Sequence, residues 1–241
     1  MSRNYRRHRT TKVAVSILVV IFALLLERSD RAQVSNTQPK LISIKTQDGG
    51  LSYGNLYGKS KKGVVLAHGG QFNKESWDKQ ARILVNAGFR VLAIDFRGYG
   101  QSKGPGQNDL SAAYLDVLAA VRYLRKSGAK TVSVVGASFG GGAAVDASIA
   151  AAPGEIDRIV VLAGYGDGPP EKIKGRKLFI LARDDANGDG PRLPKIREQF
   201  EKAPEPKKLV LLDGNAHAQF LFNTDQGERL MKEILQFLTE P

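Results

Sequence analysis

Residues 132–140 read VSVVGASFG, a short apolar run that passes directly into the pattern G-x-S-x-G. The run is long enough for a buried strand, and the stretch that begins at Phe139 has the composition of a helix. A serine at such a strand-to-helix turn is held in a sharp, strained conformation, and side chains two residues to either side would collide. The pattern therefore predicts that Ser138 presents its hydroxyl at a turn. A glycine-rich turn with an incidental serine is the alternative that the motif alone leaves open. A phosphate-binding turn is disfavoured because neither a Walker lysine nor G-x-G-x-x-G is present there.

Outward from this turn, apolar runs alternate with helical patterns. The runs, each sized for a strand buried on both faces, are Val64–Ala67, Val91–Ile94, Val132–Val135, Ile159–Leu162, Leu178–Leu181 and Leu209–Leu212. Helical spacing is found at Ser76–Ala87, Leu110–Ser127, Phe139–Ala152, Leu193–Ala203 and Asp225–Thr239. Before them, residues 41–46 and 51–57 alternate around a turn and predict an antiparallel hairpin. The order predicts an α/β fold with a mostly parallel sheet of about eight strands and helices on both faces.

Composition narrows the class of protein. The chain has 241 residues, of which 42% are hydrophobic and 25% charged, values that fit one globular domain and exclude a disordered chain. The absence of cysteine excludes a disulfide framework, a thiolate metal site and a cysteine nucleophile. The net charge of +12 raises the question of a polyanionic partner. We expect no nucleic-acid partner, and we interpret the basic clusters as solvated surface, at Lys59, Lys61, Lys62, Lys172, Lys174, Arg176 and Lys177.

The first 32 residues carry seven basic and two acidic residues, a net charge of +5, around the apolar run Val13–Leu26. As a helix this run would span about 21 Å, less than the roughly 30 Å hydrocarbon core of a bilayer. A basic segment followed by such a run predicts a secretory signal peptide or an uncleaved membrane anchor, with a buried first helix as a lesser alternative. We therefore expect residues 1–32 as a signal or anchor, 33–40 as a linker and 41–241 as an extracytoplasmic domain.

A serine hydroxyl needs a base to act as a nucleophile, and the chain offers three histidines. His8 lies in the basic leader, His68 follows the run 64–67, and His217 follows the run 209–212, beyond the serine. An acid that orients the base is expected after the intervening run 178–181, where Asp184 and Asp185 stand. The order Ser, Asp, His is the one expected around a nucleophile elbow.

Two further motifs stand after predicted strands: His-Gly-Gly at residues 68–70, and D-x-R-G-x-G-x-S at residues 95–102. Together with the elbow and the ordered serine, aspartate and histidine, they carry a resemblance. Over residues 41–238 the sequence resembles the α/β-hydrolase superfamily, most closely its small serine esterase and dienelactone-hydrolase-like members. The resemblance implies the α/β-hydrolase fold, with no cofactor and no metal.

The resemblance also implies site residues. Ser138 would be the nucleophile and His217 the general base. Asp185 would be the acid, because family acids usually stand three residues after a small residue that closes the strand; Asp184 is the alternative, and Asp167 is a less favoured one. The oxyanion hole would use the backbone N–H of Phe139 and of Gly70, with Gln71 as the alternative to Gly70. His68, Asp95, Arg97 and Ser102 are implied to be structural.

Specificity in this family usually lies in an insertion between the sixth and seventh strands, and here Gly164–Lys177 has only 14 residues. We expect no sizeable cap and an open cleft bordered by Tyr165, residues 71–73 and residues 220–222. Phe72, Tyr165 and Phe220 are the candidate substrate-binding residues, and Trp77 is expected in the core.

These features predict a serine hydrolase that cleaves carboxylic esters, or related acyl bonds, through an acyl-enzyme intermediate. Its partner would be a small-molecule ester. Alternatives are a peptidase or acyltransferase on the same scaffold, and a non-catalytic, membrane-tethered binding protein with a hydrolase fold. The acyl group and the oligomeric state do not follow from the sequence.

Overall fold

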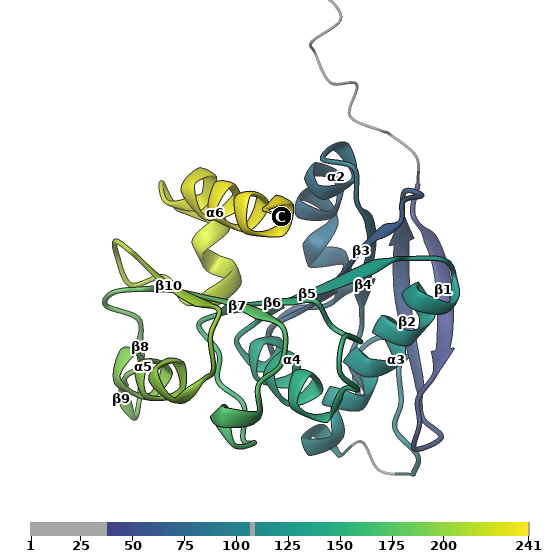
Figure 1. The fold of residues 1–241 in the computed structure, drawn as a ribbon, viewed down its shortest axis with the longest axis horizontal. Helices are drawn as coiled ribbons and strands as arrows, with labels where there is room; N and C mark the ends of the chain where they lie inside the picture. Colours follow the sequence, from purple (N-terminus) through teal and green to yellow (C-terminus); the bar gives the residue numbers. More distant parts are fainter. Residues whose placement is uncertain (1–37, 107–108, 241) are drawn as a thin grey trace, which may run out of the picture. The chain divides into compact units, whose positions relative to one another are not determined.

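An eight-stranded sheet with the order β1-β2-β4-β3-β5-β6-β7-β10 forms the centre of the protein (Figure 1). The computed structural model describes residues 38–106 and 109–240. The strands are Lys40–Lys45 (β1), Leu51–Tyr57 (β2), Lys62–Ala67 (β3), Arg90–Ile94 (β4), Thr131–Ala137 (β5), Arg158–Leu162 (β6), Arg176–Ala182 (β7) and Lys207–Leu212 (β10). β2 runs antiparallel to both of its neighbours, and the other pairs are parallel. The predicted α/β fold, its antiparallel N-terminal hairpin and its mostly parallel sheet are confirmed.

Helices cover both faces of this sheet, as the alternation of patterns predicts. They are Asp78–Asn86 (α2), Tyr114–Lys126 (α3), Phe139–Ala150 (α4), Leu193–Lys202 (α5) and Gly227–Thr239 (α6). In Figure 1, α2 and α6 lie on one side of the sheet and α3, α4 and α5 on the other. The pattern predicted at Ser76–Ala87 divides, because Asn73 accepts a hydrogen bond from the Ser76 N–H and begins a short 3-10 turn, Lys74–Trp77.

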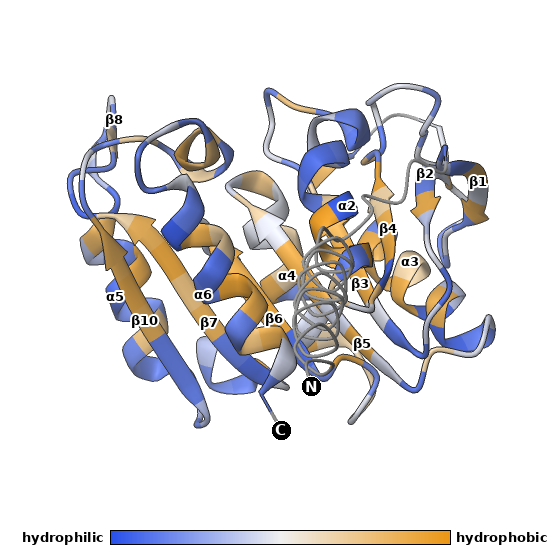
Figure 2. Ribbon diagram, turned by 90° about the horizontal axis from the view of Figure 1, so that it is seen from above, coloured by the Kyte–Doolittle hydropathy of each residue, from blue (hydrophilic) through white to orange (hydrophobic). Residues whose placement is uncertain are grey.

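The central strands are buried on both faces, as their uninterrupted apolar runs predict. Figure 2 shows the strands between α2 and α6 coloured as hydrophobic along most of their length. Trp77 is in the core, at 1% exposure, as expected. One strand departs from the prediction: in β10 Val210 is buried, whereas Leu209 and Leu211 are only half-buried. β10 pairs only with β7 because it forms the edge of the sheet, and one of its faces is therefore only partly covered.

The strand order places the site. β3 lies between β4 and β5 in the sheet. The connection after β3 leads to its neighbour on one side, β4, and the connection after β4 leads to the neighbour on the other side, β5. Loops after the carboxyl ends of such strands diverge and leave a crevice, where α/β proteins bind ligands. Ala67 of β3 is paired with Gly136 of β5, so the loop that begins at His68 and the turn at Ser138 lie side by side.

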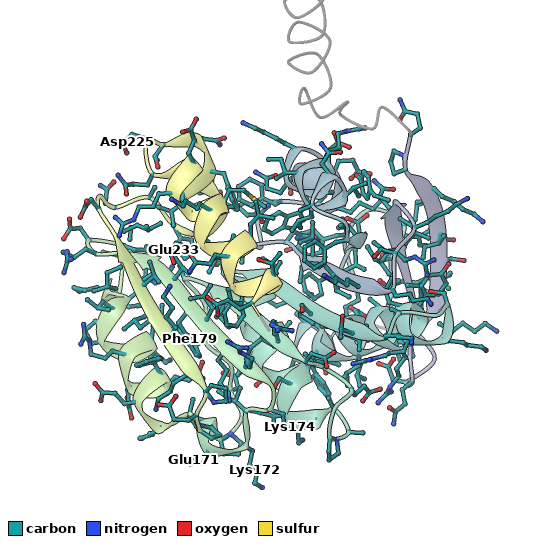
Figure 3. All side chains as sticks on the ribbon, turned by 45° about the horizontal axis from the view of Figure 1, so that its top comes forward. Glu171, Lys172, Lys174, Phe179, Asp225 and Glu233 are labelled. Atoms are coloured by element: carbon teal, nitrogen blue, oxygen red, sulfur yellow. The ribbon has the colours of Figure 1, made fainter. Side chains whose placement is uncertain are left out.

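The second basic cluster is not the solvated surface that its charge predicts. Lys172 is exposed, near the edge of the molecule in Figure 3. Lys174, in contrast, donates from Nζ to the carbonyls of Ile149 and Ala151 and so caps the carboxyl end of α4. Lys177 is buried within β7 at 2% exposure, and this burial lowers the pKa of its ammonium group. Lys174 and Lys177 are thus not solvated surface charges, because one caps a helix and the other is buried in a strand.

The predicted signal or anchor segment, Val13–Leu26, lies outside the described residues. Within residues 38–106 and 109–240, none of the helices is both long enough and apolar enough to cross a membrane.

Candidate active site

The turn between β5 and α4 holds Ser138 in a conformation that few residues adopt, with φ 52° and ψ −115°. The crowding predicted around it is severe. A Cβ on Gly136 would lie 2.1 Å from the Gly140 carbonyl oxygen, and a Cβ on Gly140 would lie 2.3 Å from the Ala67 carbonyl oxygen. Only glycine fits at either position, because backbone atoms fill the space that a side chain would need. The tight packing of α4 on β3 and β5 therefore forces the serine outward.

Three side chains from three loops meet in a hydrogen-bonded chain. His217 Nε2 lies 2.7 Å from Ser138 Oγ, and His217 Nδ1 lies 2.7 Å from Asp185 Oδ2. Asp185 follows β7 and His217 follows β10, and Leu212 of β10 is paired with Ala182 of β7. The parallel pairing of these strands brings their loops to the same end of the sheet as Ser138. Asp185 is fully buried, whereas the side chain of His217 is about one-quarter exposed.

The structure separates the two neighbouring aspartates. Asp184 is exposed, and its backbone N–H is bound to the Gly214 carbonyl, whereas the carboxylate of Asp185 contacts the His217 ring. Asp167, the other alternative, follows β6 and is exposed. Its backbone N–H donates to Asp146. Among the described residues, Asp185 is the carboxylate bound to His217.

The element that follows Asp185 was not predicted from the sequence. A two-stranded hairpin, Ala186–Asn187 (β8) and Gly190–Pro191 (β9), returns the chain to the acid. It places Arg192 Nε 3.4 Å from Asp185 Oδ1. The signal was present in the Asn-Gly-Asp-Gly sequence at 187–190, which is typical of tight hairpin turns.

The predicted oxyanion donors are backbone N–H groups of two neighbouring segments, the start of α4 and the loop after β3. Phe139 is the first residue of α4, a position whose N–H has no acceptor within the helix. Across the crevice, the N–H groups of Gly70 and Gln71 also lack an acceptor in the described part of the chain. Gln219 fixes this loop, because its Oε1 accepts from the Gly69 N–H at 2.7 Å. The predicted oxyanion donors thus have no acceptor among residues 38–106 and 109–240. Gln219 is a supporting residue that the sequence did not indicate.

His68 has no contact with Ser138 and lies fully buried beneath the loop that it opens. Its Nδ1 donates to the Gly69 carbonyl at 2.9 Å, and its Nε2 accepts from the Phe96 N–H at 3.3 Å. Burial lowers the pKa of the His68 ring, so the ring is neutral near pH 7 although Asp95 lies 3.9 Å away. The neutral tautomer satisfies both backbone partners, which fits a structural residue.

We predict that His68 makes the protein sensitive to acid. Because burial lowers the pKa of the ring in the folded state, folded chains take up a proton less readily than unfolded chains, whose pKa is near 6.5, so stability falls as the pH drops below that value. Between pH 7.5 and 5.5 the free energy of unfolding of wild type should therefore fall by more than that of His68→Gln. Urea titrations at both pH values measure the difference; equal pH dependence in the two proteins would contradict the prediction.

The second predicted motif, at residues 95–102, forms a turn that ion pairs stabilise. Arg97 is buried and contacts Asp116 at 2.9 Å and Asp48 at 2.7 Å. Hydrogen bonding to Arg97 lowers the pKa of Asp48 to about 2. Asp95 accepts from the Lys74 ammonium at 2.6 Å and from the Lys74 backbone N–H at 2.8 Å. These bonds tie the turn to the first strands and to the loop opposite Ser138, so the motif supports the site without entering it.

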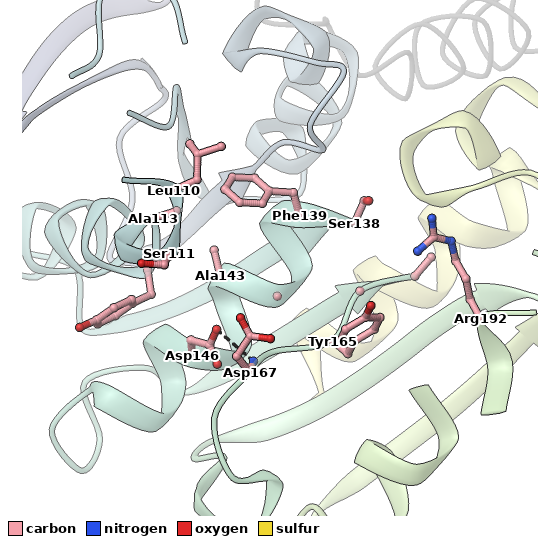
Figure 4. Close-up of a pocket in the computed structure, with 14 residues that line it drawn as sticks. Leu110, Ser111, Ala113, Ser138, Phe139, Ala143, Asp146, Tyr165, Asp167 and Arg192 are labelled. Carbon is pink, nitrogen blue, oxygen red and sulfur yellow. Dashed lines mark hydrogen bonds between the residues drawn. The ribbon is translucent and has the colours of Figure 1, made fainter. Parts of the chain in front are cut away.

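A pocket of about 320 Å³ opens beside Ser138 (Figure 4). Phe139 and Ala143 of α4, and Tyr165 after β6, form part of its wall. The remaining wall includes residues that the sequence did not indicate, namely Leu110, Ser111, Ala113, Tyr114, Asp146 and Arg192. The interval between β6 and β7 contributes a three-residue 3-10 turn, Pro170–Lys172, in place of a helical cap. The pocket is therefore open to solvent at one side of the serine.

Of the three candidate substrate-binding residues, Tyr165 alone lines this pocket. Phe72 and Phe220 pack against each other with ring centroids 4.9 Å apart, and neither is part of the pocket wall. Phe220 is 42% exposed, three residues beyond His217. The aromatic pair thus forms a separate apolar surface near the histidine.

A sequence profile described as the alpha/beta hydrolase family matches residues 64–237. Among curated proteins, the chain is 28% identical to a non-heme chloroperoxidase of Streptomyces lividans, over 67% of this chain and 53% of that protein. It is 32% identical to an esterase of Mycobacterium tuberculosis, over 58% of this chain and 45% of that protein. The chain spans about half the length, or less, of the curated relatives that it matches.

Solved structures show the same fold. An esterase of Pyrococcus furiosus superposes with a TM-score of 0.70 at 20% identity, over 83% of this chain and 92% of that chain. A dienelactone hydrolase of Anabaena variabilis superposes with a TM-score of 0.65 at 22% identity, over 83% and 95% of the two chains. The fold is shared, and the family profile covers most of the sequence, from β3 into α6. The protein belongs to the alpha/beta hydrolase family.

Proposed function

We propose that the protein is a serine hydrolase that cleaves small carboxylic esters through an acyl-enzyme intermediate. The observation that carries the proposal is the chain of two 2.7 Å hydrogen bonds that joins Ser138 to His217 and His217 to Asp185. The strained turn at Ser138 supports it, because such a turn holds the hydroxyl away from its own backbone. Esterases among the relatives and structural neighbours support the same class of substrate.

In the proposed first step, Ser138 Oγ attacks the carbonyl carbon of the ester and its proton passes to His217 Nε2. The tetrahedral adduct then breaks its bond to the leaving alkoxide oxygen, which takes the proton from His217. Water attacks the resulting acyl-Ser138 with the same proton transfers and releases the acid. Asp185 holds the His217 ring with Nδ1 protonated and stabilises the imidazolium that forms in each half-reaction.

The negative charge that develops on the carbonyl oxygen needs donors that are already in place. We assign this role to the N–H of Phe139 and of Gly70, with the Gln71 N–H as the alternative to Gly70. Their lack of acceptors, as far as the described residues go, supports the assignment. Tyr99 strengthens the loop by donating from its hydroxyl to the Gly70 carbonyl at 2.8 Å.

The proposal is tested by labelling and turnover. The full chain should react with a fluorophosphonate probe and hydrolyse short p-nitrophenyl esters. Matched amides, and ester hydrolysis in the presence of an added alcohol, distinguish an esterase from a peptidase and from an acyltransferase. An unlabelled protein that still binds a specific ligand would instead favour the non-catalytic alternative and overturn the proposal.

The pocket volume sets the size of the substrate that we expect. A pocket of about 320 Å³ is at the low end of small-molecule sites, so it suits a short acyl or alcohol group. Ala143 lines it from α4 and is 7% exposed. Replacing Ala143 with leucine adds three carbons to the wall and should lower kcat/KM for a hexanoate ester by about 10-fold or more.

Turnover of the acetate ester by the same variant should change by less than about threefold, because acetate needs little of the pocket. Ala152→Leu, an exposed site just after α4, is the matched control and should leave both esters unaffected. Equal loss for acetate and hexanoate in Ala143→Leu would mean that this pocket does not hold the variable part of the substrate.

A further inference from the structure

The acid of the site has an unusual environment on one side. Asp185 is fully buried; its Oδ2 contacts His217, but its Oδ1 has no aligned hydrogen-bond donor among the described residues. A carboxylate out of water is costly unless charge or hydrogen bonds compensate it. The cation that stands against this oxygen is Arg192, whose Nε lies 3.4 Å away. Nε also lacks an aligned acceptor in the described structure, so the two groups attract as charges.

The backbone holds this contact in place. The Arg192 N–H donates to the Asp185 carbonyl at 2.9 Å, which closes the hairpin formed by β8 and β9. Directly after Arg192, α5 begins at Leu193. The backbone of Arg192 is therefore held between a hairpin and a helix, and this position brings its side chain to Asp185.

The same side chain forms part of the wall of the pocket beside Ser138 (Figure 4). It is 21% exposed, and its outer nitrogens have no hydrogen-bonded acceptor in the described part of the chain. The charged residues that precede the acid in the chain, Arg183 and Asp184, are both exposed. Arg192 is therefore placed to act on the buried carboxylate from the substrate side.

We propose that Arg192 is a positioning residue for the reaction: its guanidinium holds the Asp185 carboxylate in the orientation in which it contacts His217. This inference rests on the proposed serine hydrolase function. It assigns to the chain a fourth side chain that acts through Asp185 and not on the reacting atoms. The physical reason is that a carboxylate held on one side only, by His217, is free to rotate, and rotation weakens its hold on the ring.

Steady-state kinetics with Arg192→Met test the proposal. We expect kcat for a short p-nitrophenyl ester to fall on the order of 10- to 100-fold, because the base is misplaced, while KM changes by less than about threefold. Arg192→Lys should recover most of the loss, since an ammonium group supplies the same charge. Arg183→Met is the matched control, because it removes an exposed arginine two residues before Asp185 and should behave as wild type.

A double-mutant cycle tests whether Arg192 acts through Asp185. In an Asp185→Asn background, Arg192→Met should cost less than about twofold, because its target is already neutral. A loss of kcat that persists undiminished in that background, or a loss that appears only in KM, would overturn the proposal and make Arg192 a substrate contact. Where Arg192→Met does not fold, Arg192→Gln serves in the same cycle.

A readout independent of turnover separates this inference from the proposed function. The proton on His217 Nδ1, observed by ¹H NMR of the full chain, should shift in Arg192→Met and remain in place in Arg192→Lys and Arg183→Met. An unchanged resonance in Arg192→Met overturns the role of Arg192 even if the protein is an esterase. A shifted resonance in a protein whose turnover does not need Ser138 would instead overturn the proposed function alone.

Discussion

Ser138→Ala is expected to lower kcat/KM for a short p-nitrophenyl ester by about 10⁴- to 10⁶-fold and to abolish labelling by a fluorophosphonate probe. The reason is that removing Oγ leaves His217 Nε2 without the atom that it is placed to deprotonate, 2.7 Å away. The residual rate should be that of water attack within the oxyanion site. Steady-state kinetics and gel-based labelling measure the two effects.

The fold should survive this substitution, because the lost hydroxyl is bonded to the partly exposed His217 ring and not to a core group. Thermal unfolding followed by circular dichroism checks this point. Ser127→Ala, an exposed serine after α3, is the matched control and should retain full activity. A further His217→Ala substitution should add little, since groups that act as a unit are not additive. Full activity in Ser138→Ala would rule out the acyl-enzyme route.

Gly136→Ala is expected to destabilise the protein by at least about 3 kcal/mol and to lower activity together with stability. The added Cβ would lie 2.1 Å from the Gly140 carbonyl oxygen and 2.6 Å from its carbonyl carbon. These are backbone atoms of the first turn of α4, so the clash is relieved only by moving the helix away from β5. That movement displaces Ser138, which lies between the two glycines. Urea-induced unfolding measures the loss of stability.

Gly188→Ala is the matched control for the same chemical change. Gly188 has open space around its α-carbon and does not have a positive φ, so alanine fits there without strain. We expect its free energy of unfolding to stay within about 1 kcal/mol of wild type, with any gain coming from a less flexible unfolded chain. If Gly136→Ala and Gly188→Ala have equal stability, the crowding at the elbow is not what holds Ser138 in place.

The sequence was sufficient to predict an element where the residues that determine its conformation lie within the same short segment. The run Val132–Val135, followed by Gly136 and Gly140 on either side of Ser138, predicts a buried strand and a sharp turn. Both predictions succeed because the burial of a strand and the steric limits of a turn depend on residues only a few positions apart. The same holds for the hairpin of β1 and β2. The hairpin of β8 and β9 was missed although its Asn-Gly-Asp-Gly turn is visible, since its strands are two residues long and carry no alternating pattern.

The roles of the charged residues were the hardest to predict, because the role of a charged side chain depends on whether the fold buries it. Lys172 and Lys177 look alike in the sequence, yet one is exposed and the other is 2% exposed within β7. Arg192 gave no signal of its own, since nothing local distinguishes an arginine before a helix from any other surface arginine. Its contact with Asp185 exists only after the hairpin has closed.

By itself, the sequence determined the alternation of strands and helices, the serine turn and a list of three histidines short enough to single out His217. These follow from steric limits and hydrophobic periodicity, which act over a few residues. Only the tertiary structure decided that Asp185 and not Asp184 contacts the ring, and that Arg192 lies against the acid. It also decided that α4 and the residues before α3 line the pocket, whereas Phe72 and Phe220 do not. The physical reason is that adjacent residues of a loop point in different directions. Which of them meets His217 depends on the pairing of β7 with β10, which are distant in the sequence.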